Sequence, residues 1–94
     1  MISLANIKSQ IKRNKQNEKR RLRNRHIIGR ARTSVKKARE SISAGVQDEA
    51  VESTRMAISA LDKAVEKGVL HKNNAARRKS RLMKHLNELQ RKTA

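Results

Sequence analysis

Basic side chains are the residues of this sequence best suited to do chemistry, and most lie in one stretch. Residues 8–39 hold 14 Lys or Arg and a single acid, Glu18, which gives a local charge of +13. Like charges at this density repel one another unless a polyanion neutralises them. Because the stretch has no proline and no aromatic residue, we expect a helix that presents cations to a polyanion.

Catalytic residues are not indicated by any pattern in the chain. There is no cysteine, no glycine-rich phosphate loop and no His-Glu-x-x-His pair of the kind that binds zinc. The three histidines are isolated: His85 is expected to pair with Glu88 on a helix surface, and His26 to pack or to contact a phosphate. For His71, which precedes Lys72, a nucleic-acid contact and a plain loop role are equally favoured. The sequence therefore predicts no enzyme, no metal site and no cofactor.

Length and composition narrow the class of protein. A chain of 94 residues without Phe, Tyr or Trp is expected to form one small domain, 1–94, with a marginal core. No apolar run is long enough to span a bilayer, and the N-terminus lacks the apolar region of a secretory signal. We therefore expect a soluble, cytoplasmic protein. Its net charge of +17 points to RNA, DNA or an anionic membrane surface as the partner.

The distribution of charge divides the first helix, which we expect over residues 6–44 after a tail of residues 1–5. In the basic arm, residues 8–25, cations point to every side, so this part has no apolar face to pack on its own domain. We expect it to be poorly ordered alone and helical among phosphates. After His26 an apolar stripe with helical spacing begins, at Ile28, Ala31, Val35, Ala38 and Ile42.

Two shorter helices are expected after Gly45, over residues 47–67 and 74–91, separated near Gly68. Glycine commonly ends a helix in the left-handed conformation. Short connections make successive helices antiparallel neighbours. The fold class predicted is all-α: an antiparallel three-helix bundle whose long first helix projects beyond the bundle.

Apolar stripes and caps are predicted for these helices as well. The second helix should bury the residues Val51, Thr54, Ile58, Leu61 and Val65, and the third Leu82, Met83, Leu86 and Leu89. Side-chain caps are expected from Ser3 or Asn6 and from Asn73 or Asn74, and Asp48 or Gln47 is expected to open the second helix. Because Glu52, Asp62 and Glu66 would repel phosphate, we expect the polar face of the second helix to lie away from nucleic acid.

The mode of nucleic-acid recognition follows from what is missing. Without aromatic residues there is no stacking platform for single strands, and no recognition-helix, zinc-finger or zipper pattern for DNA is present. Recognition of backbone and shape remains, which suits folded RNA, although composition alone does not choose RNA over DNA. A DNA-compacting, histone-like protein is the first alternative. A membrane-surface peptide is the second, and residues 8–25 offer it only Ile11 and Leu22 as large apolar residues.

Two sequence blocks carry a family resemblance. The first comprises ANIKSQIKRN at residues 5–14 and NEKRRLRN at 17–24; the second comprises DKA at 62–64 and KGVLHKNNAARRKS at 67–80. Together they resemble the bacterial small-subunit ribosomal protein S20 family in order and spacing. The resemblance implies a three-helix bundle without enzyme activity or cofactor, in the 30S subunit. It also implies direct binding to the 5′ domain of 16S rRNA and contact with the long penultimate helix.

Carried over by position, the resemblance makes the basic arm and the 71–81 block the main RNA contacts. The predicted RNA-binding residues are Lys8, Lys12, Arg13, Asn14, Lys15, Lys19, Arg20, Arg21, Arg23, Asn24, Arg25, Arg30, Arg32, Lys36, His71, Lys72, Asn73, Asn74, Arg77, Arg78, Lys79 and Arg81. No small-molecule substrate, membrane or homo-oligomer is expected. The family pattern starts Met-Ala-Asn-Ile-Lys, so residues 1–3 are expected to reflect a start site assigned too far upstream, with Leu4 at the initiator position.

Overall fold

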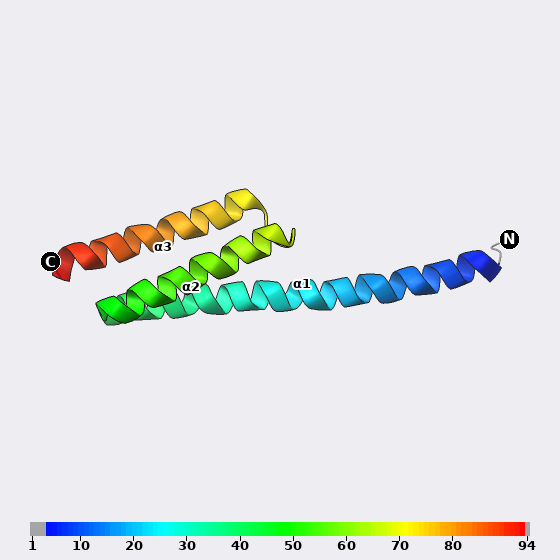
Figure 1. Cartoon of the computed structure of the whole chain (residues 1–94), viewed down its shortest axis with the longest axis horizontal. Helices are drawn as coiled ribbons and strands as arrows, with labels where there is room; N and C mark the ends of the chain where they lie inside the picture. Colours follow the sequence, from blue (N-terminus) through cyan, green and yellow to red (C-terminus); the bar gives the residue numbers. More distant parts are fainter. Residues whose placement is uncertain (1–3, 94) are drawn as a thin grey trace.

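The computed structural model describes residues 4–93, and these form three helices: α1 (Leu4–Ala44), α2 (Gln47–Glu66) and α3 (Lys72–Thr93) (Figure 1). No strand occurs in the described range. The predicted all-α class is confirmed, with a long first helix on a bundle of antiparallel helices. The expectations for the start site and for a Ser3 cap concern residues 1–3, which lie outside the described residues.

The long axis of the molecule is set by α1. The described chain measures 72 × 20 × 14 Å, and its radius of gyration is 19.3 Å, against about 12 Å for a compact domain of this length. The C-terminal half of α1 packs beside α2, while its N-terminal half runs on alone (Figure 1). Every residue from Leu4 to Arg23 is exposed. Up to Arg23 the basic arm therefore packs against no other described helix. The expectation that it is poorly ordered without RNA stays a prediction.

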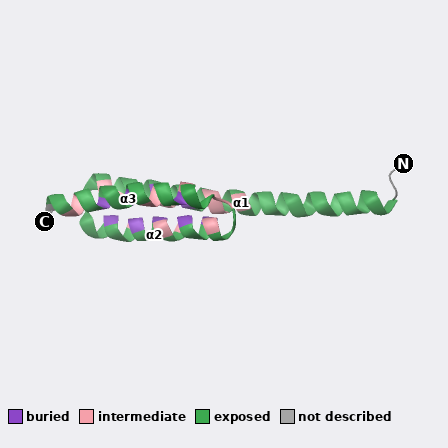
Figure 2. Cartoon of the chain, turned by 90° about the horizontal axis from the view of Figure 1, so that it is seen from above, coloured by how far each residue is buried: buried purple, intermediate pink, exposed green. Residues whose placement is uncertain are grey.

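The core lies between the three helices and is built largely from alanine. Of the ten buried apolar residues in the described chain, six are alanines; the others are Val35, Leu61, Leu82 and Leu86. Buried positions run along the facing sides of the bundle helices and stop where the arm begins (Figure 2). Small side chains let helix backbones approach closely, but each contributes little apolar area.

The predicted stripes are confirmed for α1 at Ala31, Val35 and Ala38, which are all buried. For α2 and α3, the prediction of burial is wrong at two residues: Val51 is 41% exposed and Met83 is 40% exposed. The buried face of α2 is instead centred on Ala50, Thr54, Ala57, Leu61 and Ala64, so alanines form the middle of this face. Thr54 is the polar member of that face, and its Oγ1 has no hydrogen-bond partner among the described residues.

Glycine ends α1 and α2, as predicted. Gly45 has φ 78° and Gly68 has φ 72°. At the end of α2 the amides of Gly68 and Val69 donate to the carbonyls of Val65 and Ala64, at 2.9 and 3.0 Å. This pair of bonds is the Schellman arrangement that closes a helix C-terminus. It returns the chain toward the bundle, where Leu70 packs against the core.

Two of the three helix starts differ from the predictions. Because no helix breaker precedes Asn6, α1 is already helical at Leu4, and Asn6 is no cap. α2 begins at Gln47, as predicted, and its N-cap is Val46, which makes no side-chain cap bond. At α3, the ring of His71 takes the place predicted for asparagine: its Nδ1 accepts from the backbone N–H of Asn73 at 3.1 Å.

Candidate nucleic-acid interface

The basic arm displays cations without packing any of them. Its Lys and Arg residues are all exposed: Lys8, Lys12, Arg13, Lys15, Lys19, Arg20, Arg21, Arg23 and Arg25. Glu18 is the single acid against these nine, and its Oε1 lies 3.6 Å from Arg21 Nη2, with both side chains more than half exposed. Such a pair is weak in water. The arm therefore offers a cylinder of free positive charge about 27 Å long over residues 8–25.

The two asparagines predicted in the arm differ from each other. Asn14 is exposed, so both its amide nitrogen and its carbonyl oxygen can reach RNA. Asn24 is partly buried, and its Oδ1 is shielded from solvent with no hydrogen-bond partner in the described chain. Asn24 lies where exposed residues give way to packed ones, and Ile27 follows as the first partly buried apolar residue.

Beyond this point α1 carries cations on two flanks of its buried stripe. Arg25 and Arg30 line a groove between α1 and α2. Arg32 is on the other flank, at a small cavity of about 120 Å³ that it shares with Asn74 and Arg78 of α3. Lys36 is exposed. The predicted cations of this part of α1 therefore lie on different surfaces: Arg25 and Arg30 on the groove beside α2, and Arg32 at the cavity beside α3.

The 71–81 block forms the start of α3, at the end of the bundle from which the arm projects (Figure 1). Lys72, Asn73, Arg77 and Arg81 are exposed. The amide of Asn73 is already bonded to His71. Because that bond uses one of the donors of the helix start, the block relies on side-chain cations for binding anions more than on free backbone amides.

Three residues of the block are held by neighbours. Arg78 Nε donates to Asn74 Oδ1 at 2.8 Å, one helical turn away. Lys79 Nζ donates to Asp62 Oδ1 of α2 at 2.7 Å. The first bond fixes the direction of a guanidinium and leaves its Nη groups for other acceptors. The second pairs Lys79 with a carboxylate of the protein itself.

A cluster of cations between α1 and α3 contains residues that the sequence did not identify. Arg39, Arg78, Arg81, Lys84 and His85 line a cavity of about 370 Å³, to which no acid contributes. Arg39 and Lys84 were not among the predicted contacts. The sequence did contain a pattern that could have indicated both residues. Arg39 directly follows the apolar stripe residue Ala38, and Lys84 lies three residues after Arg81, one turn along the same helix.

Metal-binding clusters and membrane-spanning helices were also considered for the described part of the chain. Across residues 4–93, no three His, Asp or Glu side chains come together in a way that could hold a metal ion. None of the described helices combines the length and the apolar character needed to cross a membrane. What the arrangement can do is bind anions over an extended surface.

Comparison with known proteins agrees with the geometry. A family model described as ribosomal protein S20 matches residues 5–87. Small ribosomal subunit protein bS20 of Streptomyces avermitilis is 57% identical over 79 residues, covering 84% of this chain and 90% of that protein. The bS20 protein of Thermobifida fusca is 52% identical over 91 residues, covering 97% and 99%. With most of its length matched in this way, the chain belongs to the ribosomal protein S20 family, whose members are structural and not enzymatic constituents of the ribosome.

Proposed function

We propose that this protein binds 16S rRNA directly, through phosphate and shape recognition, and helps to assemble the 30S subunit. Its relatives are named as proteins of the small ribosomal subunit, so this chain is a constituent of that subunit in the cytoplasmic ribosome. The proposal adds the contact itself: the 5′ domain of the RNA and its long penultimate helix.

The basic arm is the observation that carries the proposal. It is a helical segment with nine cations and one acid, its residues up to Arg23 are all exposed, and most of it projects beyond α2 and α3 (Figure 1). A surface of this kind gains free energy by neutralising phosphates and releasing their counterions. Because it has no aromatic residue, it recognises the placement of phosphates and 2′-hydroxyls and does not stack on bases.

The bundle end supplies a second contact beside the root of the arm. The exposed cations Lys72, Arg77 and Arg81 of α3 lie at the end of the bundle from which α1 projects. RNA strands that converge there can touch the arm and α3 together. With +17 net charge, two copies repel each other, so we propose that the protein binds as a monomer.

A competition experiment tests this function against general polyanion binding. The protein is bound at fixed salt to a folded 5′-domain fragment of 16S rRNA and challenged with duplex DNA or with the same RNA unfolded. We expect the folded fragment to be preferred strongly. Equal affinity for all three nucleic acids would favour the DNA-compacting alternative and contradict the proposed function.

Chemical footprinting then locates the contacts on the RNA. Backbone protection is measured on 16S rRNA with and without the protein. Protection is expected in the 5′ domain and in the penultimate helix. Protection elsewhere, or none above that caused by an unrelated basic protein, contradicts the proposed binding sites.

A further inference from the structure

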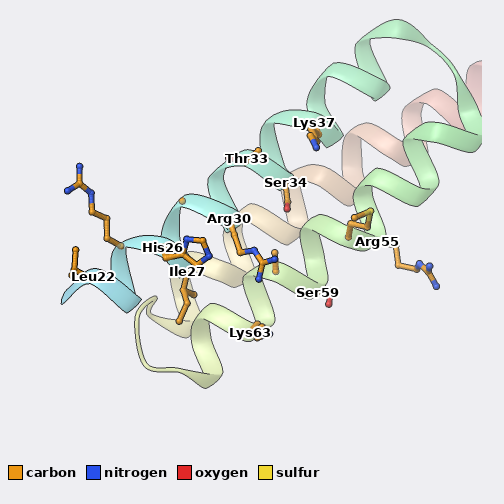
Figure 3. Close-up of a pocket in the computed structure, with 14 residues that line it drawn as sticks. Leu22, His26, Ile27, Arg30, Thr33, Ser34, Lys37, Arg55, Ser59 and Lys63 are labelled. Atoms are coloured by element: carbon orange, nitrogen blue, oxygen red, sulfur yellow. The ribbon is translucent and has the colours of Figure 1, made fainter. Parts of the chain in front are cut away.

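A groove of about 1080 Å³ lies between α1 and α2. Nine residues of α1 and five of α2 line it, and α3 contributes none. Leu22 and Arg25 of the basic arm line one end of it, whereas no residue of the 71–81 block does. We call it the α1–α2 groove (Figure 3).

The cations of α2 line this groove, whereas its acids do not. The helix has five acids and two cations, and both cations, Arg55 and Lys63, line the groove, whereas none of the acids does. From α1 come Arg25, Arg30 and Lys37. Five Lys or Arg and no Asp or Glu therefore border one hollow, although α2 as a whole is acidic.

Small and hydroxyl side chains make the groove hollow. A Cβ added at Gly29 would meet nothing within 4 Å. Thr33, Ser34 and Ser59 bring hydroxyl groups to the walls. Arg30 and His26 extend from α1 toward α2 across the hollow (Figure 3). Arginine, lysine and hydroxyl side chains are the groups that contact the phosphates and sugars of nucleic acids.

The carboxylate that pairs with Arg55 does not close the site. Arg55 Nη2 lies 3.0 Å from Glu52 Oε1, but the two side chains are 76% and 58% exposed. An ion pair this exposed contributes little, so a phosphate can replace the carboxylate. Leu22 and Met56, which also line the groove, are more than half exposed and give it apolar surface on which a ribose can rest.

We propose that the α1–α2 groove binds a segment of the RNA sugar–phosphate backbone, which makes α2 part of the RNA interface. The inference rests on the proposed RNA binding and extends it to the helix that its overall charge would exclude. The cluster of Arg39, Arg78, Arg81 and Lys84 lies between α1 and α3. The bundle would then contact RNA in both of the grooves that flank α1. Charge favours RNA over a protein helix here, because five cations would face the apolar side of such a helix.

A charge-matched pair of variants tests the groove. Arg55→Gln with Lys63→Gln removes the two α2 cations, while Arg91→Gln with Lys92→Gln removes two exposed cations from the end of α3. For the groove variant we expect at least a roughly tenfold loss of affinity for the folded 5′-domain fragment, as for two lost charged hydrogen bonds. The slope of log affinity against log salt should fall by about 1.4–1.8. The control variant should change both much less, and both variants should melt like the parent.

A tethered probe gives an independent readout. The chain has no cysteine, so Met56→Cys at the groove and Asn87→Cys on the exposed side of α3 each provide a unique attachment site. A chelated iron that generates hydroxyl radicals from position 56 should cleave the RNA backbone at a discrete segment. No cleavage above that produced from position 87 overturns the proposal.

The outcomes separate this inference from the proposed function. If the groove variant binds like its control while substitutions in the basic arm weaken binding, the groove proposal is wrong and RNA binding by the arm stands. If the parent protein does not distinguish the folded fragment from duplex DNA, the proposed function fails, whatever the groove variant does.

Discussion

Lys79 Nζ lies 2.7 Å from Asp62 Oδ1, and this ion pair links α3 to α2 across 17 positions of sequence. Both residues belong to the second of the blocks that resemble the S20 family, yet one is acidic. The pair brings a carboxylate to the 71–81 block and uses one of its cations. It also connects two helices whose buried contacts are few and small. We infer that Lys79 serves the bundle more than the RNA.

Lys79→Gln and Arg77→Gln separate these two roles. Both changes remove one charge from α3, but the Lys79 side chain is 34% exposed and paired, whereas Arg77 is exposed. Lys79→Gln should lower the free energy of unfolding by about 0.2–1 kcal/mol and reduce RNA affinity less than Arg77→Gln does. Thermal melting and RNA binding at fixed salt measure the two effects. An equal loss of RNA affinity in both variants would contradict our assignment of Lys79.

In the basic arm, replacing Arg13, Arg20, Arg21 and Arg23 with Ala should weaken binding without unfolding the protein. These side chains are exposed, and alanine keeps the helix propensity high. The slope of log affinity against log salt should fall by about 2.8–3.6, while the cooperative melting of the bundle stays nearly unchanged. Circular dichroism melts and salt titrations give both numbers. Loss of the bundle transition would show that the arm is needed for folding.

Leu61→Ala and Val51→Ala test which side of α2 is buried. Leu61 is 1% exposed and belongs to the core cluster, whereas Val51 is 41% exposed. Leu61→Ala should cost about 2–5 kcal/mol, enough to unfold much of so small a bundle. Val51→Ala should change stability by less than about 1 kcal/mol, because valine is no better a helix former than alanine. Urea unfolding of the two variants decides between the faces, and similar losses would refute the assignment.

Glycine substitutions should have opposite signs at two positions. Gly68 adopts φ 72°, where a Cβ is strained, so Gly68→Ala should destabilise the protein by about 1 kcal/mol. Gly29 is inside α1, and an added Cβ meets nothing within 4 Å. Gly29→Ala should therefore stabilise the helix by about 0.5–1 kcal/mol. Melting temperatures that move in the same direction for both variants would contradict the assigned backbone conformations.

Local patterns predicted the helices well, because each depends on residues a few positions apart. The 3–4 spacing after His26 located the packed half of α1, and Gly45 and Gly68 located the ends of two helices. Contacts between residues of different helices could not be predicted from the sequence. The pairing of Lys79 with Asp62 and the position of Arg55 and Arg30 on one groove depend on the register in which helices pack.

Charge was informative for whole segments and less so for single residues. The acidic total of α2 conceals two cations that line one groove, and the expectation that the face with Glu52, Asp62 and Glu66 lies away from nucleic acid stays a prediction. On a helical projection of α2 at about 100° per residue, Arg55 and Lys63 lie about 80° apart with Glu66 between them, so a projection does not separate the cations from this acid. Nor does it give which of the neighbouring helices the cations face.

The alanine-rich core has a consequence for the fate of protein that has not met its RNA. With six alanines among the ten buried apolar residues of the described chain, the folded state has a narrow margin over the unfolded chain. A ligand that binds only the folded form raises the free energy of unfolding, by about 2.7 kcal/mol when its concentration is roughly 100 times the dissociation constant. Under the proposed RNA binding, copies in excess of the RNA unfold more often and are open to proteases, so the amount of this protein follows the amount of RNA available to hold it.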